Sequence, residues 1–443
     1  MNTLYPASDS TAKSHACDHR CDSETKASSA AAAPIDAPML RRWPQGEWTR
    51  VPAWAYTDEA IYRQEQQRIF EGPSWSYGAL ECEIPNPGDF VLTNVGEKSV
   101  VIVRNEDQTI HAFANACAHR GVAFVREPRG NAQGFTCPYH QWSYDLKGKL
   151  NGIPFRRGYK GNGGMPKDFS IDGRGAQPLQ VARRGGVIFL SFDPKVESFE
   201  TNLGAMGKYF DRVFDGRELK VMGYMRQRIH SNWKLMFENI KDPYHASVLH
   251  VFLMSFGLFR MDQESAVEMD ETGRHSALIS RRGGKADETA AKEMSNNLRA
   301  EFTLQDPRLL DIVREFPGEA TVVMQTLWPN LIVQQQSNTL AMRQIVPRGP
   351  GAFDLNWTFF GYADDTPEMT QRRVRQANLM GPSGLVSVDD SEVLAMSQNG
   401  LDDYPDNECV IEMGGRDTSD ATHMITEVAI RAFYKHYIKV MGL

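Results

Sequence analysis

Cysteine is scarce in this chain of 443 residues. It has six cysteines, and its amino terminus shows no charged stretch followed by the apolar stretch that directs secretion. A small secreted protein held together by disulfides would need many more cysteines for its length. These observations argue against a disulfide framework, and we expect reduced thiols in a cytoplasmic protein.

Long apolar runs and an excess of positive charge are also missing. The longest candidate, GVIFLSF at 186–192, is far shorter than the roughly 20 residues that cross a bilayer. The formal net charge is -7, and Lys and Arg are scattered. A nucleic-acid partner would require a basic stripe for its phosphates. We therefore expect neither a membrane span nor a nucleic-acid partner, and the length suffices for two domains.

Composition and hydrophobic pattern divide the chain into four parts. Residues 1–42 contain SSAAAAP without a sustained apolar period, which predicts a disordered leader. An amphipathic helix, YTDEAIYRQEQQRIFEG with Ile61, Ile69 and Phe70 facing inward, is expected in a helical segment at 43–74 that packs on the domain at 196–443. Short alternating runs at 75–195 predict a small antiparallel β domain. Residues 196–443 read as an α+β domain ending in a helix at about 420–441, with Ile425, Val428, Ala432 and Phe433 at helical spacing.

The β domain contains two short loops that each offer one thiolate and one imidazole. Cys117-x-His119 is followed, after seventeen residues, by Cys137-x-x-His140. A zinc finger normally pairs Cys with Cys and His with His, whereas both loops are mixed here. A Rieske [2Fe–2S] centre requires this mixture, because one iron takes two thiolates and the other takes two histidines. The spacing therefore predicts such a cluster.

A similar pattern occurs at Cys17-Asp18-His19-Arg20-Cys21 in the leader. It lacks a second loop and flanking strands, so we interpret it as an accident of composition.

A second group of metal-ligand residues lies in NWKLMFENIKDPYHASVLH, 232–250, which includes Glu238 and Asp242. His245 and His250 are about 140° apart on an ideal helix, so both can bind one ion only if the helix bends or ends, as Pro243 allows. A carboxylate from elsewhere would complete a 2-His-1-carboxylate iron site. The adjacent Asp389 and Asp390 are the candidates, since an acidic pair in an apolar segment is costly without a cation; the alternative is that they cap a helix.

Taken together, these blocks resemble a known family. The two cluster loops, the 232–250 block and GPSGLVSVDD are similar in order and spacing to the large (α) subunits of Rieske non-haem iron aromatic-ring-hydroxylating oxygenases. The resemblance runs from about residue 43 to the end. It is strongest to the branch that acts on aromatic acids, namely salicylate 5-hydroxylase, anthranilate 1,2-dioxygenase and terephthalate dioxygenase, through EIPNPGDF, CPYHQWSYDLKG, MTQRRVRQANL and VIEMGG.

The resemblance implies a fold and a role for each candidate residue. The fold would be α+β, with an antiparallel β Rieske domain followed by a helix-grip catalytic domain. Cys117 and Cys137 would bind one cluster iron, and His119 and His140 the other. The mononuclear Fe(II) would be held by His245, His250 and Asp390, and Asp242 would bridge a cluster histidine of one subunit and an iron-bound histidine of its neighbour.

The resemblance also implies partners. The α subunits would form a head-to-tail homotrimer, possibly α3β3 with a small β subunit. Electrons from NAD(P)H would arrive through a separate ferredoxin or ferredoxin reductase, since no G-x-G-x-x-G follows a strand here. Dioxygen would then hydroxylate an aromatic acid, by salicylate 5-hydroxylation or by anthranilate- or benzoate-type dihydroxylation.

An aromatic acid substrate requires a cation in an otherwise apolar pocket. Arg343, in the strand-like TLAMRQIVP, is the leading candidate; alternatively it is an outward residue of an alternating strand. Gln334, Gln335, Gln336 and Asn338 give the same sheet hydrogen-bonding capacity, and Arg431 is a second choice. Two other protein classes remain open at this point: a Rieske electron carrier without oxygenase activity, and a zinc-dependent structural protein.

Overall fold

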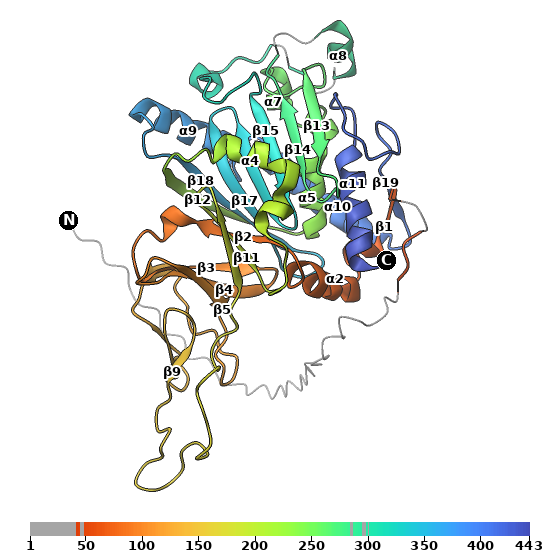
Figure 1. The fold of residues 1–443 in the computed structure, drawn as a ribbon. Helices are drawn as coiled ribbons and strands as arrows, with labels where there is room; N and C mark the ends of the chain where they lie inside the picture. Colours follow the sequence, from red (N-terminus) through yellow and green to blue (C-terminus); the bar gives the residue numbers. More distant parts are fainter. Residues whose placement is uncertain (1–40, 45–47, 284–286, 295–297, 300) are drawn as a thin grey trace, which may run out of the picture. The chain divides into compact units, whose positions relative to one another are not determined.

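The computed structural model describes residues 41–44, 48–283, 287–294, 298–299 and 301–443. Most of the leader, with Cys17, His19 and Cys21, lies outside these described residues. Figure 1 gives the element labels used below.

Antiparallel strands make up the region between residues 75 and 195. Runs such as Val100 to Val103 in β4 are buried on both faces, as β-branched residues in a packed sheet are expected to be. A four-stranded sheet has the order β5 (Ile110–Ala114), β4 (Lys98–Arg104), β3 (Asp89–Val95), β6 (Arg129–Asn131). A three-stranded sheet joins β7 (Phe135–Thr136), β8 (Ser143–Tyr144) and β9 (Leu150–Gly152). Another joins β10 (Gln180–Arg184), β11 (Val187–Ser191) and β2 (Ser76–Leu80).

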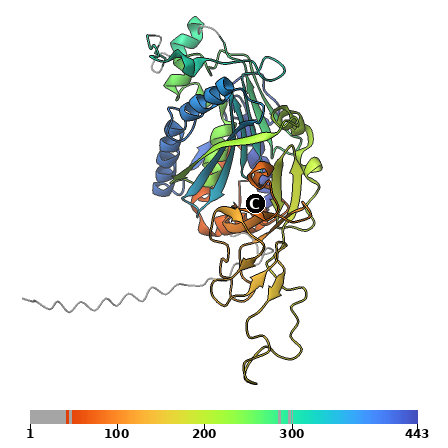
Figure 2. The same ribbon diagram turned by 90° about the vertical axis from the view of Figure 1, so that its left-hand side faces the viewer.

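A seven-stranded antiparallel sheet forms the centre of the C-terminal region, and Figure 2 shows it from the side. Its order is β12 (Leu219–Ile229), β18 (Phe353–Tyr362), β17 (Thr339–Pro347), β16 (Leu331–Gln336), β15 (Val322–Leu327), β14 (Ser276–Ser280), β13 (Ser265–Met269). Both faces are covered. Ile332, Ala341 and Trp357 belong to the core that contains helices α5 and α11, whereas Val333 and Phe360 face β2, β11 and α4. Because side chains alternate along a strand, Gln334, Gln336 and Arg343 share the α5 face.

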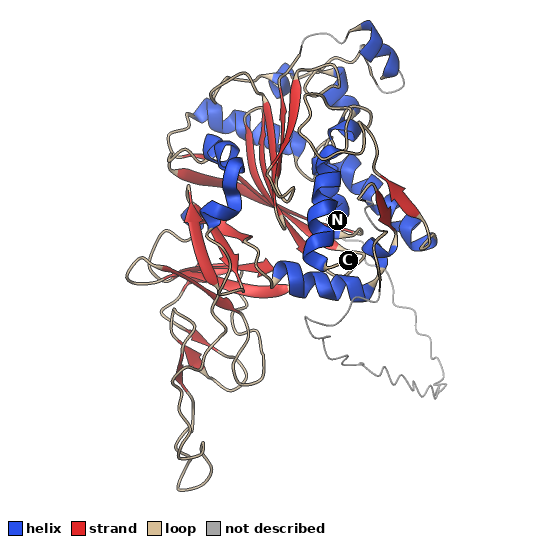
Figure 3. Cartoon of the chain, turned by 45° about the vertical axis from the view of Figure 1, so that its right-hand side comes forward, coloured by secondary structure: helices blue, strands red, loops and turns tan. Residues whose placement is uncertain are grey.

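Four longer helices frame this sheet, as Figure 3 shows. They are α5 (Trp233–Lys241), α9 (Pro367–Met380), α10 (Ser387–Asp403) and α11 (Val428–Met441). Side chains at the preceding residue cap α5 and α9, namely Asn232 and Thr366. The predicted last helix begins later than expected. Thr426 Oγ1 accepts a hydrogen bond from the backbone N–H of Val428, the first residue of α11. Ile425 therefore precedes the helix and is 42% exposed.

Short elements complete the described chain. The predicted helix at 56–72 divides at Asp58, whose side chain caps α2, and Ile61, Ile69 and Phe70 are buried as predicted. The short helices are α1 (Trp54–Thr57), α2 (Glu59–Glu65) with its π-helical continuation Gln66–Phe70, α3 (Phe199–Leu203), α4 (Gly207–Val213), α6 (Pro243–Ala246), α7 (Val251–Ser255) and α8 (Glu288–Glu293). Strands β1 (Arg50–Pro52) and β19 (Glu408–Val410) form a two-stranded sheet. Within the described residues, no helix is long and apolar enough to span a bilayer.

A buried ionic cluster connects the N-terminal helices to the C-terminal half. Glu65 of α2 accepts hydrogen bonds from Lys234 Nζ at 2.5 Å, Trp233 Nε1 at 2.7 Å and Tyr437 Oη at 2.6 Å. All four side chains are buried. Removing one partner would leave an uncompensated charge in the interior, so the cluster fixes α2 against α5 and α11.

Candidate metal centres and substrate cavity

The two cluster loops have the same backbone design. In each, the cysteine carbonyl accepts a hydrogen bond from a residue four positions on, Gly121 N at 2.8 Å and Gln141 N at 3.0 Å. Gly121 and Gln141 both adopt positive φ, at 72° and 59°. These tight turns bring Cys and His to the same side of each loop. The imidazole rings of His119 and His140, from different loops, lie 4.6 Å apart.

Thiols and imidazoles differ in their exposure. Cys117 and Cys137 are buried, whereas His119 and His140 are half-buried. His119 stacks on Trp142, with ring centroids 4.6 Å apart and an interplanar angle of 5°. The cluster would therefore be anchored inside on its cysteine side and open toward the surface on its histidine side.

The chemistry of this donor set fits a Rieske cluster. Burial disfavours the Cys117 thiolate, but hydrogen bonds, first among them that of Tyr144 Oη to Cys117 Sγ at 3.0 Å, give the thiol a lowered pKa. Burial, together with the nearby His119 and Arg120, lowers the pKa of His140 and favours the neutral ring that binds metal. His119 Nδ1 is buried without a hydrogen-bond partner. Two thiolates and two neutral imidazoles are what this cluster requires.

The second group assembles where α5 ends. Asp242 follows its last residue, and the Asp242 Oδ1 atom caps α6 by accepting from Tyr244 N at 2.8 Å and His245 N at 3.2 Å. The helix ends between His245 and His250, as predicted from their positions on an ideal helix, and the chain turns before α7. Asp390 reaches the same point from α10. The ligand atoms of His245, His250 and Asp390 all lie within 4.8 Å of one another.

Distances within this triad match a single metal ion. Asp390 Oδ1 lies 3.4 Å from His245 Nε2 and 3.2 Å from His250 Nε2. Atoms this far apart can occupy adjacent positions around an ion whose bonds to N and O are about 2 Å long. Burial opposes ionisation of the Asp390 carboxyl group, yet His245 and His250 keep its pKa well below the usual range. Against the same burial, Asp242 and Asp390 raise the pKa of His245 to about 10. The group therefore favours a cation.

The other nitrogen of each histidine faces a second carboxylate. His250 Nδ1 is 3.2 Å from Asp389 Oδ2, and His245 Nδ1 is 3.4 Å from Asp242 Oδ2. Carboxylates in this position fix the orientation of metal-binding imidazoles. Asp389 and Asp390 thus lie on opposite sides of His250, and neither is the N-cap of α10, which is Val386. The cap interpretation of the acidic pair is wrong.

Sequence inspection missed Asn239. Its Nδ2 atom lies 3.2 Å from both His245 Nε2 and Asp390 Oδ1, and its Oδ1 is buried without a partner. Asn239 stands two residues before the end of α5, so its position beside the triad follows from helix geometry once the triad is known. Glu238, by contrast, points away from the triad and accepts hydrogen bonds from Tyr56 and Tyr434.

An apolar cavity leads away from the triad. Arg343 lies in its wall and is only 3% exposed, so the outward alternative is wrong. The guanidinium group lies over Trp357, 4.2 Å from the ring centroid, and its Nη1 donates a hydrogen bond to Gln334 at 3.4 Å. Among the cavity-lining residues are Leu253, Phe259, Leu278, Val322, Met324, Gln334, Gln336, Arg343, Trp357, Met380, Val386 and Ser387.

Several donors in this cavity lack partners. Arg343 Nε and Nη2, Trp357 Nε1 and Ser387 Oγ are buried and have no hydrogen-bond partner among the described residues. In the described part of the chain, no carboxylate lies within ion-pair distance of Arg343. Burial lowers its pKa to about 10, and the Asp390 charge opposes this. Arg431 lies elsewhere, where it binds the carbonyls of Ile411, Met413 and Asp417.

Comparison with known proteins gives the family. Residues 216–443 match the ring hydroxylating alpha subunit (catalytic domain) family, and residues 74–161 match the Rieske [2Fe-2S] domain family. The chain belongs to the ring-hydroxylating oxygenase α subunits. It is 52% identical to the salicylate 5-hydroxylase large oxygenase component of a Ralstonia species, over 91% of this chain and 97% of that protein. It is 44% identical to the anthranilate 1,2-dioxygenase large subunit of Burkholderia cepacia, over 90% and 95%.

Structural comparison agrees with this membership. Naphthalene 1,2-dioxygenase from a Rhodococcus species, bound to indole, superposes with a TM-score of 0.73 at 25% identity, over 88% of this chain and 94% of that one. The α subunit therefore has the predicted α+β fold with a Rieske [2Fe–2S] domain and a non-haem iron catalytic domain. It is the large component of a multi-component oxygenase that needs a reductase or ferredoxin. The predictions of family, fold, cofactors and ring hydroxylation are confirmed, and the electron-carrier and zinc alternatives are wrong.

Proposed function

We propose that this α subunit hydroxylates the ring of an aromatic carboxylic acid. Arg343 carries the proposal, because a buried guanidinium with two partnerless N–H groups in an apolar cavity requires an anion. Ser387 and Gln336 line the same cavity and could bind a hydroxyl or amino group next to the carboxylate. Relatives named for salicylate, anthranilate and terephthalate support this substrate class.

The proposed site roles follow the donor geometry. Cys117, Cys137, His119 and His140 hold the cluster, and His245, His250 and Asp390 hold the mononuclear iron. When bound, these groups supply single electrons and activate dioxygen. The protein holds the substrate carboxylate at Arg343, keeps the ring among Leu253, Phe259 and the other apolar wall residues, and excludes water. Asp389 orients His250, and Asp242 orients His245.

We further propose an assembly and a location. The α subunits form a head-to-tail homotrimer, with or without a small β subunit, and Asp242 links His245 to a cluster histidine of the neighbouring subunit. A ferredoxin or ferredoxin reductase delivers electrons from NAD(P)H in the cytoplasm. The domain limits are 43–74, 75–195 and 196–443.

Product identification tests the substrate class. The purified α subunit, with a matching reductase, is incubated with aromatic acids and with the corresponding neutral carboxamides. We expect ring-hydroxylated products from acids only. Hydroxylation of amides and acids at equal rates would contradict an anion-binding role for Arg343.

Substitution of Arg343 tests the residue itself. Arg343→Gln should raise the KM for the acid by about 30-fold or more, because truncating one partner of a buried charge pair costs about 2–5 kcal/mol. Arg226→Gln, an exposed position of β12 in the same sheet, is the control and should leave KM unchanged. An unchanged KM in Arg343→Gln would place the carboxylate elsewhere.

A further inference from the structure

Oxidisable aromatic side chains form a continuous row between the iron-binding group and the surface beside α1. The row consists of Tyr434 of α11, Tyr56 and Trp54 of α1, and Trp43, and it is called the aromatic row below. Tyr434 and Tyr56 are fully buried, Trp43 is 6% exposed and Trp54 is half-buried. Phenols and indoles lose a single electron far more easily than the ring of phenylalanine does. The row therefore contains side chains that can pass an electron on.

Neighbouring members of the row are in contact. The Oη atoms of Tyr434 and Tyr56 lie 2.9 Å apart. The ring centroid of Trp43 lies 5.4 Å from that of Tyr434 and 5.7 Å from that of Trp54. These are separations of aromatic pairs in contact. Because the rate of electron transfer falls steeply with distance, such a row divides a long path into short steps.

The inner end of the row lies at a cleft that reaches His245. Tyr56 and Glu238 line this cleft of about 580 Å³ together with Asp242 and His245. Glu238 and Asp242 are four residues apart at the end of α5, so their side chains lie on the same side of the helix. The Asp242 carboxylate faces His245 Nδ1. The tyrosines that bind Glu238 are therefore one helical turn from the carboxylate behind an iron-binding imidazole.

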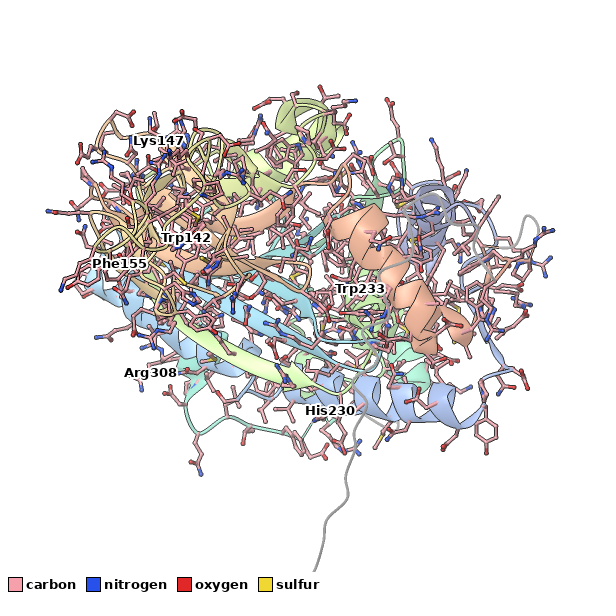
Figure 4. All side chains as sticks on the ribbon, turned by 90° about the horizontal axis from the view of Figure 1, so that it is seen from below. Trp142, Lys147, Phe155, His230, Trp233 and Arg308 are labelled. Atoms are coloured by element: carbon pink, nitrogen blue, oxygen red, sulfur yellow. The ribbon has the colours of Figure 1, made fainter. Side chains whose placement is uncertain are left out.

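The outer end of the row reaches the surface. Trp54 lines a second cleft, of about 590 Å³, together with exposed residues such as Arg42. Figure 4 shows the N-terminal helices beside Trp233, the first residue of α5, and the hydrogen bond from Trp233 to Glu65 ties them to that helix. A soluble reductant can therefore meet Trp54, while Tyr56 of the same short helix stays buried.

Oxidation of a tyrosine also requires a place for its phenolic proton. Glu238 accepts hydrogen bonds from both tyrosines, from Tyr56 at 3.2 Å and from Tyr434. Its carboxylate can take the proton when Tyr434 loses an electron and return it when the electron is replaced. Burial raises the pKa of Glu238 to about 7, so the carboxylate form is available just above neutral pH.

Packing alone does not explain these side chains. The core beneath the cluster loops is filled with phenylalanine rings such as Phe113 and Phe135. Phenylalanine would fill the same space at Tyr56 and Tyr434, whereas burying hydroxyls and a carboxyl group is costly unless they pair with one another. The two phenols and Glu238 form such a group. It is better suited to move a proton than to fill a core.

We propose that the aromatic row carries electrons from the surface to the iron-binding group when dioxygen is activated and no substrate is hydroxylated. The row then reduces the unused oxygen to water and protects the cavity from oxidation. This is an activity in addition to ring hydroxylation. The inference rests on the proposed iron site at His245, His250 and Asp390 and does not depend on which substrate is bound.

The electrons and protons of this reaction balance. Oxygen at the level of hydrogen peroxide takes up two electrons and two protons and leaves as two waters. Ferrous iron supplies one electron and Tyr434 the other, and the Tyr434 proton passes to Glu238. A soluble thiol at Trp54 replaces the electron through Trp43 and also replaces the proton. Two oxidised thiols join as a disulfide, and the reductase returns the iron to the ferrous state.

Rapid-freeze electron paramagnetic resonance tests the first step. Protein with ferrous iron, an oxidised cluster and no substrate is mixed with hydrogen peroxide at pH 8. We expect a tyrosyl radical whose signal narrows when tyrosine is ring-deuterated. The double variant Tyr56→Phe, Tyr434→Phe should lose this signal, and Glu238→Gln should lose most of it because the proton acceptor is missing. Tyr209→Phe removes a tyrosine that is hydrogen-bonded to Glu268 outside the row, and it should keep the signal.

Interruption of the row tests the path to the surface. Trp43→Phe keeps both tyrosines, so the radical should form but persist after glutathione is added, whereas in the parent it should decay. Oxidation of Met324 and Met380, which line the cavity, should then increase in peptide mass spectrometry. Trp75→Phe, at a buried tryptophan outside the row, is the matched control and should behave as the parent. Equal decay in Trp43→Phe and the parent would overturn the path.

Iron analysis separates the inference from the proposed iron site. Asp390→Ala should contain no mononuclear iron and give no radical with peroxide. If it keeps its iron, the iron assignment fails, whatever radical the parent gives. If the iron-loaded parent gives no tyrosyl radical, the inference is wrong and the iron assignment stands. Cluster absorbance and melting temperature confirm that each variant is folded.

Discussion

The two candidate metal centres differ in how they are built. The candidate cluster ligands lie within 24 residues, on two loops of the same backbone design, with imidazoles near the surface. The triad of His245, His250 and Asp390 joins residues up to 145 positions apart, and Asp390 and His250 are buried. Local turns are enough for a site that exchanges electrons with partners. A site that must exclude water and hold a substrate requires the whole fold.

The residues that surround the two centres also differ. The core beneath the cluster consists of aromatic and aliphatic residues such as Phe113, Phe124 and Phe135. The catalytic half also buries ionisable groups, among them Glu238, Lys241 and Arg343. Buried charges are costly unless they are paired, so their concentration in one half marks where the chemistry takes place.

The largest expected effect comes from the triad itself. Asp390→Ala should remove the mononuclear iron and abolish hydroxylation while leaving the cluster spectrum unchanged, because the two sites share no ligand. Asp389→Ala should keep the iron, since Asp389 contacts only the Nδ1 side of His250. Iron analysis and cluster absorbance are the measurements. Loss of iron in Asp389→Ala with retention in Asp390→Ala would reverse the assignment.

Substitution in the cluster loops should have the converse effect. His119→Cys should lower the reduction potential by about 0.2 V or more, toward that of all-cysteine clusters, and stop reductase-driven turnover. The mononuclear iron should remain, because the triad does not depend on the cluster loops. Electron paramagnetic resonance and redox titration read the change. An unaltered Rieske signal would refute the ligand assignment.

The same contrast explains what the sequence could predict. The cluster donors follow from spacing, because two tight turns determine their positions locally. His245 and His250 follow from one helix that must end between them. Asp390, however, was indistinguishable from Asp389 by pattern, since only the direction from which α10 approaches His250 separates them. Asn239 carried no signal, because an Asn on an amphipathic helix is unremarkable until its neighbours are known. Orphaned donors such as Trp357 Nε1 require coordinates.

Asp242 tests whether the two centres communicate. Asp242→Asn keeps an oxygen to cap α6 but replaces the carboxylate that faces His245 Nδ1. We expect both metal sites to remain and turnover to fall by about 10- to 100-fold, the usual cost of losing a carboxylate behind a metal-binding histidine. Rapid-mixing absorbance should show that the reduced cluster reoxidises slowly with substrate and dioxygen present. Normal reoxidation would leave Asp242 with a capping role alone.

The smallest effect concerns stability, and it distinguishes the two halves by their buried charge. Burial raises the pKa of Glu238 to about 7, although its hydrogen bonds with Tyr434 and Tyr56 oppose this. An acid whose pKa is raised on folding stabilises the protonated folded state, so its contribution is full below the unfolded value near 4.5 and is lost as the pH rises to about 7. Between these two pH values, the free energy of unfolding falls by at most about 3 kcal/mol.

Glu238→Gln should therefore remove this dependence while keeping hydrogen bonds to both tyrosines. The measured quantity is the difference in melting temperature between the variant and the parent from pH 5 to pH 8. We expect the melting temperature of the variant to rise relative to that of the parent as the pH increases to 7. Above pH 7 the difference should stay constant. Buried His275 and half-buried His436, whose lowered pKa values of about 3 and about 4 make the fold less stable in acid, affect both proteins equally and cancel. Within the described residues, no Asp or Glu of the domain of the cluster loops is among the buried residues, so this domain should contribute nothing to the difference. A difference that is constant with pH would show that Glu238 is ionised throughout, and that Tyr434, Tyr56 and Lys234 together outweigh the effect of burial on its pKa.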